Sequence, residues 1–534
     1  MTDDSHDAII IGAGFAGMYM LHTLRERGFR AHVYEKGDDV GGTWYWNRYP
    51  GARCDVESLY YCYSFSEELQ QEWRWTERYP SQPEILRYAR HVADRFDLRR
   101  DISFGTTARS AAYDEDADEW VLTTEDGART RARFLITAVG CLSATQLPDL
   151  PGRDSFAGEA YHTGRWPHEP VDFGGKRVGV IGTGSSAIQA IPVIAEQAAS
   201  VTVFQRTAQF SIPAHNHPLS DEEQRRVKAD YGRLRAEARM SHSGILSEQR
   251  EEDPLELPAE QVRAELERRW AIGGTTFTAT YEATLRDPDA NALSAEFVRD
   301  KIRATVDDPE TAELLCPYDH PIGTKRICVD TDYYATYNRE HVELVSLREQ
   351  PISEITPRGV RVGDREHEFD VLVFATGYDA LTGPLTRIDI RGVDGLRLRD
   401  KWRDGPRSYL GVANAGFPNM FTITGPGSPS VLSNMIVSIE QHVEWIAEHL
   451  EHLRETGTRR CEADPAAERE WAEHVNEVAD ETLFPQAASW YMGANVPGKP
   501  RVFMPYIGGV GVYRELCDEV ARQGYRGFHL TAAG

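Results

Sequence analysis

The stretch that decides the fold is residues 7–36, DAIIIGAGFAGMYMLHTLRERGFRAHVYEK. An apolar run leads into the pattern Gly12-x-Gly14-x-x-Gly17, a helical stretch follows, and a second apolar run ends at Glu35, 18 residues past the third glycine. A strand, a glycine-rich turn, a helix and a strand in this order, closed by an acid, are typical of a Rossmann dinucleotide-binding unit.

Each part of this pattern has a physical role. Gly12 permits the tight turn, Gly14 lets the backbone approach a pyrophosphate, and Gly17 lets helix and strand pack closely. The start of the helix offers unpaired N–H groups and a positive dipole end to phosphates. We expect Glu35 to accept hydrogen bonds from ribose hydroxyls, which suits FAD.

Residues 176–207, KRVGVIGTGSSAIQAIPVIAEQAASVTVFQRT, repeat the plan. The fingerprint here is Gly182-x-Gly184-x-x-Ala187, and the position of the acid holds Gln205, followed by Arg206. A carboxylate there would repel a ribose 2′-phosphate, whereas an arginine pairs with it. We therefore predict that the second unit binds NADPH; the alternative is that Arg206 is only a surface residue.

The two units predict an α/β fold with two Rossmann-like dinucleotide-binding domains, for FAD and NADP, and a helical insert. Apolar strands at 132–140 and 370–380, each followed by small residues, are expected to be the crossovers between them. The charged segment in between has a helical pattern and is expected to cap the NADP domain. The predicted bounds are 1–144 and 385–534 for the FAD domain, 145–219 and 313–384 for the NADP domain, and 220–312 for the insert.

Composition excludes several classes of protein. The net charge is −25, which argues against a nucleic-acid partner because phosphate binding needs a basic face. The seven cysteines form no C-x-x-C pair, so we expect no disulfide framework and no metal site. No basic signal segment and no long uncharged apolar run is present. We expect a cytoplasmic enzyme without a membrane span, and a monomer.

A short segment before the second fingerprint then becomes informative. Residues 156–167, FAGEAYHTGRWP, contain Phe156, Gly158, His162 and Trp166, followed by Pro167. This spacing resembles the fingerprint of type I Baeyer–Villiger monooxygenases. The resemblance covers nearly the whole chain, and within the family it is strongest to the phenylacetone and steroid monooxygenases. It includes residues 41–58, 182–189, 323–334, 425–435 and 488–501.

The resemblance implies an enzyme that uses FAD, NADPH and O2 to convert hydrophobic ketones to esters or lactones, through a C4a-peroxyflavin. Sulfoxidation is implied as a side activity. The alternative is a flavin monooxygenase that acts mainly on sulfur or nitrogen nucleophiles. Such enzymes carry a similar motif that ends in Tyr or Phe, so Trp166 and Pro167 favour oxidation of ketones. A disulfide reductase is disfavoured because it needs a cysteine pair.

The resemblance also assigns roles to single residues. It implies that Arg326 is catalytic and that Asp55 holds it in place. Lys325 is expected to reach the NADP 2′-phosphate together with Arg206 and Thr207, and Trp490 to close a loop over the site. The fingerprint around His162 is expected to act as a joint that ties backbone together, without acid or base chemistry.

Further contacts follow from the same match. The expected cofactor-binding residues also include Thr43, Trp44, Asp55, Ser185 and Ser186. The expected substrate pocket is mostly apolar, as a hydrophobic ketone requires. It consists of Val56, Cys141, Leu142, Ser430, Val431, Leu432 and Met435.

Overall fold

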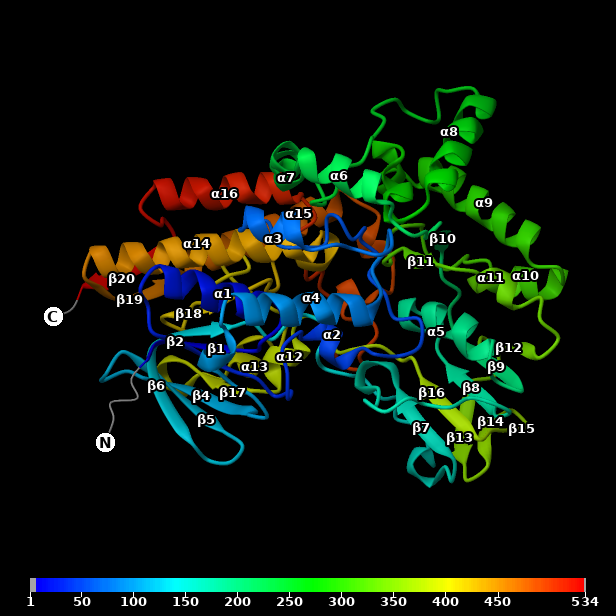
Figure 1. Cartoon of the computed structure of the whole chain (residues 1–534), viewed down its shortest axis with the longest axis horizontal. Helices are drawn as coiled ribbons and strands as arrows, with labels where there is room; N and C mark the ends of the chain where they lie inside the picture. The colour runs from blue at the N-terminus through cyan, green and yellow to red at the C-terminus, as the bar shows by residue number, and fades with distance from the viewer. Residues whose placement is uncertain (1–5, 533–534) are drawn as a thin grey trace.

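A computed structural model of the chain describes residues 6–532, and its two largest sheets are separate from each other. Figure 1 shows the first sheet at the lower left and the second at the lower right, with long helices above them. The predicted α/β class with two dinucleotide-binding units is confirmed by this arrangement together with the comparisons reported below.

The first sheet has eight strands in the order β17-β4-β5-β6-β1-β2-β3, and β18 pairs with β6. Strands β1, β2, β3, β6 and β18 run parallel, while β5 pairs antiparallel with β4 and with β6. The strands are β1 (His6–Ile11), β2 (Ala31–Tyr34), β3 (Ile102–Ser103), β4 (Ala108–Asp114), β5 (Glu119–Thr124), β6 (Arg129–Thr137), β17 (Asp389–Arg391) and β18 (Met420–Thr422).

The second sheet has five strands, all parallel, in the order β12-β9-β8-β16-β7. They are β7 (Glu159–His162), β8 (Arg177–Ile181), β9 (Ser200–Gln205), β12 (Val342–Ser346) and β16 (Val371–Phe374). A small antiparallel sheet follows β12 and consists of β13 (Ile352–Thr356), β14 (Gly359–Val362) and β15 (Arg365–Glu368). The strands expected at both fingerprints are therefore present.

Helices cover the first sheet and enclose its core. Helix α1 (Phe15–Glu26) packs against the long α14 (Met435–Glu455), which also contacts α16 (Val510–Arg522) and β19 (Thr458–Ala463). The remaining elements on this side are α2 (Thr43–Trp46), α3 (Glu67–Glu72), α4 (Gln82–Arg95), α12 (Gly383–Thr386), α13 (Leu398–Lys401), α15 (Pro465–Asp480) and β20 (Phe528–Ala532). Helix α5 (Ser185–Ala195) packs against β8 and β9 of the second sheet, as α1 packs against β1 and β2 of the first.

A run of helices separates β10 (Ser211–Pro213) from its parallel partner β11 (Cys328–Asp330), which leads into α11 (Tyr333–Thr336). The run contains α6 (Asp221–Ala229), α7 (Tyr231–Met240), α8 (Ala259–Ile272), α9 (Pro288–Thr305) and α10 (Pro309–Leu315). Side chains of α8 and α9, including Leu266 and Phe297, belong to the core of the second unit.

The first two helices of this run make different contacts from those expected. Val227 of α6 packs against the core of the first unit, and Lys228 donates to backbone carbonyls at Gln71 and Trp73. Arg235 of α7 donates to the carbonyls of Leu59 and Tyr60. The helical run is thus shared between the two cores, whereas we expected all of it to cap the NADP unit. The domain bounds themselves remain a prediction.

Between residues 6 and 532, no helix is long and apolar enough to cross a membrane. All seven cysteines are buried and unpaired.

Candidate active site

The turn after β1 fits a dinucleotide because it leaves no room for side chains. Gly12 has φ +104°, and a Cβ there would lie 2.6 Å from the carbonyl oxygen of Ala138. A Cβ on Gly17 would lie 1.8 Å from the carbonyl oxygen of Gly12. Helix α1 begins after Gly14, and no side chain caps it. Its first N–H groups can therefore meet a phosphate.

Glu35 lies just past β2 and is turned inward. Its two carboxylate oxygens accept hydrogen bonds from the backbone N–H groups of Ala13 and Gly37, each at 2.6 Å. Burial raises the pKa of Glu35, and these N–H groups oppose the shift. A carboxylate has about four acceptor positions, so two remain for ribose hydroxyls. Nearby, Thr43 is exposed, while Trp44 is buried and donates to the Tyr61 hydroxyl at 3.0 Å.

The glycine turn after β8 forms the same kind of phosphate cradle as the glycine turn after β1. Gly182 has φ +110°, and a Cβ there would lie 2.5 Å from the carbonyl oxygen of Ala375. Helix α5 also begins after a glycine, Gly184, without a side-chain cap. The next two residues reach other segments: the Ser185 hydroxyl lies 3.3 Å from Cys328 Sγ, and the Ser186 hydroxyl 3.1 Å from that of Thr163.

At the end of β9 the two units differ. Gln205 is buried, and its amide Nε2 donates to the carbonyl oxygen of Leu314 in α10 at 2.6 Å. The next residue, Arg206, is exposed. Burial lowers the pKa of Lys325, Asp319 opposes this, and the nearby Arg206 lowers it further. Two cations that influence each other's charge in this way suit a phosphate dianion. The adjacent Thr207 is half-buried.

Arg326 and Asp55 form a bidentate ion pair. Nε of Arg326 donates to Oδ2 of Asp55 at 2.7 Å, and Nη2 donates to Oδ1 at 2.8 Å. Nη1 donates to the backbone carbonyl of Val431 at 2.6 Å. Three contacts therefore fix the plane of the guanidinium, although the two side chains are separated by 271 residues in sequence.

This pair stays ionised across the neutral pH range. Burial by itself raises the pKa of Asp55, but the Arg326 guanidinium and its hydrogen bonds bring that pKa below its usual value. Burial alone lowers the pKa of Arg326, and Asp55 more than offsets this. The two side chains keep 28% and 21% of their surface exposed, so the charges border an open space.

The segment that carries Asp55 rests on helix α5. Gln189 of α5 accepts from the Tyr49 hydroxyl at 2.8 Å and donates to the Arg53 carbonyl at 3.1 Å. Gly51 has φ +76°, and a Cβ there would lie 2.3 Å from the Gln189 carbonyl oxygen. No local pattern in the sequence indicates these contacts between residues 49–53 and α5, because the partners lie far apart along the chain.

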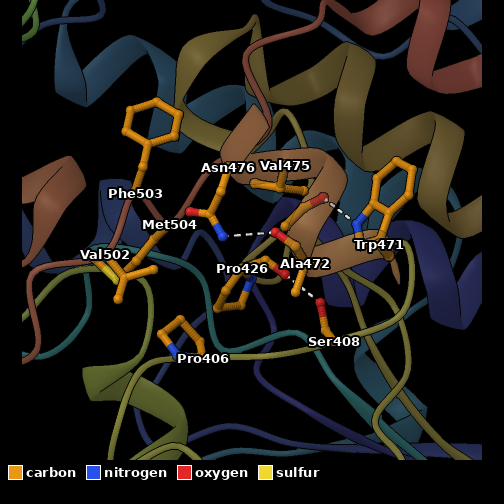
Figure 2. Close-up of a pocket in the computed structure, with 11 residues that line it drawn as sticks. Pro406, Ser408, Pro426, Trp471, Ala472, Val475, Asn476, Val502, Phe503 and Met504 are labelled. Carbon is orange, nitrogen blue, oxygen red and sulfur yellow. Dashed lines mark hydrogen bonds between the residues drawn. The ribbon is translucent and has the colours of Figure 1, made fainter. Parts of the chain in front are cut away.

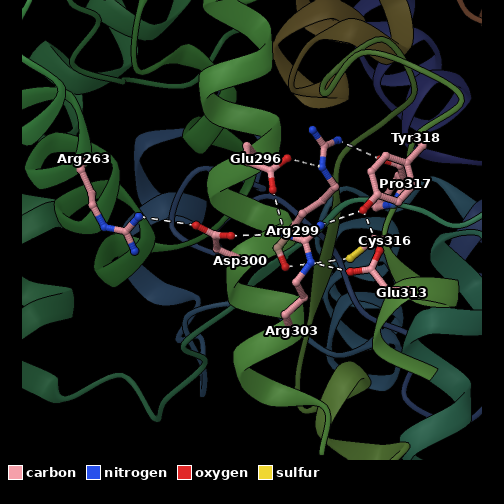
Figure 3. A network of polar contacts seen from close by, with 9 residues as sticks. All are labelled: Arg263, Glu296, Arg299, Asp300, Arg303, Glu313, Cys316, Pro317 and Tyr318. Atoms are coloured by element: carbon pink, nitrogen blue, oxygen red, sulfur yellow. Dashed lines mark hydrogen bonds and ion pairs between the residues drawn. The ribbon is translucent and has the colours of Figure 1, made fainter. Parts of the chain in front are cut away.

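The segment that carries Lys325 and Arg326 is held by α9. Asn291 donates to the Ile322 carbonyl at 2.9 Å and accepts from its N–H at 3.0 Å. Arg299 donates to the Pro317 carbonyl at 3.0 Å, within the polar network of α9 and α10 in Figure 3. In that network Arg303 binds Glu313 at 2.6 Å. These contacts fix the backbone of the segment from which the side chains of Lys325 and Arg326 extend.

Most of the predicted pocket residues lie together. Cys141, Leu142, Val431, Leu432 and Met435 belong to one apolar cluster that also contains Trp490 and Tyr491. The Cys141 Sγ lies 3.0 Å from the Ser430 hydroxyl. Val56 is the exception, since it belongs to the large core of the first unit.

A different cavity lies beside α15, shown in Figure 2. Its volume of about 20 Å³ is close to the space of one water molecule. None of the predicted pocket residues lines it; its walls include Pro406, Ser408, Pro426, Trp471, Val475 and Met504. We therefore do not assign it to the substrate.

The loop at 488–501 is tied to the crossover after β16. Asn495 donates to the Tyr378 carbonyl at 2.6 Å, and Lys499 binds the Asp379 carboxylate at 2.7 Å. Trp490 is half-buried, while the next residue, Tyr491, is buried in the same apolar cluster as Val431. Tyr491 is a site residue that sequence reasoning did not single out.

The fingerprint at 156–167 forms a junction. His162 ends β7, its Nδ1 accepts from the N–H of Gly164 at 3.0 Å, and its Nε2 lies 3.4 Å from the Thr376 hydroxyl. Burial lowers its pKa to about 4, so the ring is neutral at physiological pH. Trp166 is buried in the second core. A Cβ on Gly158 would lie 2.6 Å from the Phe156 ring.

Comparison with known proteins places this site in a family. The family model of the pyridine nucleotide-disulphide oxidoreductases matches residues 9–243. The chain is 44% identical to acetone monooxygenase (methyl acetate-forming) from Gordonia sp., over 99% of this chain and 100% of the relative. It is also 44% identical to phenazine N-monooxygenase from Lysobacter antibioticus, over 99% and 98%. A Baeyer–Villiger monooxygenase from Pseudooceanicola batsensis is 42% identical, over 97% and 95%.

Solved structures agree with these relatives. An oxidised steroid monooxygenase bound to NADP superposes with a TM-score of 0.95 at 49% identity, covering 99% of this chain and 100% of the other. A monooxygenase in complex with FAD and NADP gives a TM-score of 0.95 at 40% identity, covering 98% and 99%. Taken with the two glycine cradles, these matches show that the chain belongs to the type I Baeyer–Villiger monooxygenases, flavoenzymes that use FAD and NADPH.

Proposed function

We propose that the enzyme consumes O2 to oxidise hydrophobic ketones to esters or lactones, and that Arg326 is the catalytic cation. The observation that carries this proposal is the guanidinium of Arg326, fixed by three contacts at the edge of an apolar cluster. FAD, once reduced by NADPH, supplies the chemistry of oxygen transfer. The protein has to hold the reactants, stabilise negative charge and exclude water.

Arg326 has donors to spare for a negatively charged oxygen. A guanidinium carries five N–H groups. Two of those on Arg326 reach Asp55 and one reaches Val431. The remaining donors can bind an oxyanion that develops when the ketone carbon is attacked. Because the group is already oriented, little reorganisation is needed during the reaction.

Asp55 acts as the positioning partner of Arg326. A bidentate pair fixes both the direction and the plane of the guanidinium. Asp55 is held in turn by the contact between Arg53 and Gln189 of α5. The pair therefore joins the segment after α2 to the segment before β11, so the geometry of the site depends on how the two units meet.

We propose that NADPH lies at the start of α5, with its 2′-phosphate between Arg206 and Lys325 and beside Thr207. In support, Arg206 directly follows β9, whose end corresponds to the position of Glu35 in the first unit, and its charge contributes to lowering the pKa of Lys325. We also propose that Trp490 covers the nicotinamide side and keeps water out. In support, Asn495 and Lys499 tie its loop to the crossover after β16. The FAD phosphates are assigned to the start of α1, and the FAD ribose to Glu35.

The apolar cluster beside Arg326 favours a hydrophobic substrate. The Val431 carbonyl accepts a hydrogen bond from Arg326, and the Val431 side chain packs in the cluster. This residue therefore links the wall of the proposed pocket to the catalytic arginine. Cys141 is buried, and burial raises the pKa of its thiol. It therefore serves as a small neutral wall residue.

The test is a panel of aryl, cyclic and steroid ketones with NADPH and O2. Ester or lactone is quantified beside hydrogen peroxide and O2 uptake. We expect at least one hydrophobic ketone to give ester in near 1:1 ratio to NADPH consumed. If NADPH oxidation yields peroxide alone with every ketone, the assignment of ketones as substrates is wrong.

A second candidate is oxidation of nitrogen or sulfur nucleophiles. It is favoured by the 44% identity to a phenazine N-monooxygenase. A thioether and an N-heteroaromatic compound are therefore added to the panel. We expect sulfoxide only as a minor product; a kcat/KM for either compound above that for all ketones would make this candidate the main function.

We also propose that the enzyme works as a monomer in the cytoplasm. The seven unpaired cysteines suit a reducing compartment. Sedimentation of the FAD-loaded enzyme with and without NADP checks the first point. A stable dimer under both conditions contradicts it.

A further inference from the structure

His442 is a buried histidine that the reaction proposed above does not use. It lies on α14 and keeps only 1% of its surface exposed. Ile439 and Val443 of the same helix belong to the core of the first unit. A polar ring in such a place is costly unless its nitrogens are paired, so the partners of His442 indicate its role.

Both ring nitrogens of His442 are paired. Nδ1 accepts from the backbone N–H of Thr424 at 2.8 Å, and Nε2 lies 2.8 Å from the hydroxyl of Tyr513 in α16. Because Nδ1 accepts, the proton of the neutral ring is on Nε2 and is donated to the Tyr513 oxygen. The Tyr513 hydroxyl donates in turn to the Leu410 carbonyl. Burial lowers the pKa of His442 to about 3, which keeps the ring neutral.

Thr424 has a backbone conformation that threonine rarely adopts. It lies two residues after the end of β18, and its φ is +55°. For a β-branched residue this left-handed conformation is strained, and it persists only where surrounding contacts enforce it. The hydrogen bond to His442 is such a contact, because it fixes the direction of the Thr424 N–H.

The carbonyl of Thr424 contacts two of the predicted pocket residues. It accepts from Cys141 Sγ at 3.4 Å and from the Ser430 hydroxyl at 3.3 Å. Ser430 is itself strained, with φ +39°. The carbonyl of the next residue, Val431, accepts from Arg326 at 2.6 Å. Direct contacts therefore lead from the buried histidine, through one strained turn, to the arginine of the proposed mechanism.

We propose that His442 is a positioning residue for ester formation, which fixes Thr424 and, through the turn that follows, the carbonyl that orients Arg326. This inference rests on the function proposed above, in which Arg326 stabilises the developing oxyanion. His442 transfers no proton in this role. Loss of its acceptor leaves the buried Thr424 N–H unpaired, so the strained turn relaxes and the guanidinium loses its orientation. A misplacement of about 1 Å can lower a rate by about 100-fold.

The test separates the two ends of the ring in the FAD-loaded enzyme, by comparing His442→Asn with His442→Gln. The asparagine oxygen is one atom beyond Cγ, as Nδ1 is, so this variant keeps an acceptor for Thr424 and loses the contact with Tyr513. The longer glutamine places its amide near the position of Nε2, so it keeps a partner for Tyr513 and loses Thr424. Tyr513→Phe is the matched control, because it removes the far contact and leaves the ring in place.

The expected effects differ between these variants. His442→Gln should lower kcat for ester formation about 10- to 100-fold and release more peroxide per NADPH, with KM for the ketone changed less than about threefold. His442→Asn and Tyr513→Phe should keep kcat within about threefold of the unmodified enzyme, although both should lower the melting temperature. The anaerobic rate of flavin reduction by NADPH should be unchanged in all three. A role in folding alone would change the melting temperatures without a separate loss of kcat in His442→Gln.

Two results would overturn the inference. One is an unchanged kcat and ester yield in His442→Gln. The other is an equal loss of kcat in His442→Asn or in Tyr513→Phe, because it would show a general effect of weakening the core around α14.

Arg326→Ala, measured in parallel, tells the two proposals apart. If Arg326→Ala loses ester formation while His442→Gln keeps it, only the inference about His442 fails. If Arg326→Ala forms ester normally, the proposed function of the arginine fails, and the positioning role built on it fails too.

Discussion

The two dinucleotide-binding units have the same backbone geometry at the glycine turn but differ at the end of the second strand. Both have a strongly positive φ at the first glycine, +104° at Gly12 and +110° at Gly182. In both, the carbonyl oxygen of an alanine, Ala138 or Ala375, leaves no room for a Cβ there. Both helices begin after an extended glycine without a side-chain cap.

The difference lies where the second strand of each unit ends. Glu35 turns inward and accepts from the backbone of its own glycine turn. Gln205 instead donates to α10, and the exposed Arg206 follows. In the proposed assignment, the turn at the start of the helix recognises what the two cofactors share, the pyrophosphate. On the same proposal, the strand end distinguishes a free ribose from a phosphorylated one.

The third fingerprint position gives the largest predicted effect. Gly17→Ala would place a Cβ 1.8 Å from the Gly12 carbonyl oxygen, so we expect loss of FAD and a destabilisation of about 3 kcal/mol or more. The second unit already has alanine at this position, and Ala187→Gly should cost only about 1 kcal/mol with FAD retained. Flavin absorbance per protein and the melting temperature are the measurements. Full flavin content in Gly17→Ala would show that the first cradle is not as tight as the structure indicates.

Substitution of Arg206, which follows β9, gives the next largest predicted effect. Arg206→Ala should raise KM for NADPH about 10- to 100-fold and leave KM for NADH nearly unchanged, because a charge-assisted phosphate contact is lost. Arg225→Ala, an exposed arginine on α6, is the control and should change neither value. Steady-state kinetics with both coenzymes decide it. Equal changes in both KM values would remove Arg206 from the phosphate site.

The junction between the units gives a smaller, pH-dependent effect. Burial lowers the pKa of His162 to about 4, so folding requires the neutral ring. The stability that this provides is complete above the unfolded pKa of about 6.5 and is lost as pH falls toward 4. Between pH 8 and pH 5 we expect His162 to account for about 2 kcal/mol of lost stability. Denaturant unfolding of His162→Gln should show a shallower decline over this range; identical pH profiles would contradict the assignment.

The sequence predicted the repeated parts of the molecule well. Both strand–turn–helix units were recognisable because glycine spacing and apolar runs are local signals, and β8 and β9 flank the second glycine turn and its helix as expected. The pairing of Arg326 with Asp55 was implied only by family resemblance, because no local pattern relates residues 271 positions apart.

Other features depend on contacts that the sequence does not display. Charged amphipathic helices reveal a buried face without telling which core it meets, so the sharing of α6 to α10 between two cores was missed. Val56 packs into the first core, and its place at the substrate stays a prediction.

The central claim is that the two units supply cofactors while Arg326, held by Asp55, stabilises charge at the reacting centre. The most direct measurement is single turnover of Arg326→Ala, with anaerobic reduction by NADPH followed by mixing with O2 and a ketone. We predict that the flavin is still reduced, that ester is absent, and that peroxide is released. Reduction together with a normal ester yield would contradict the account.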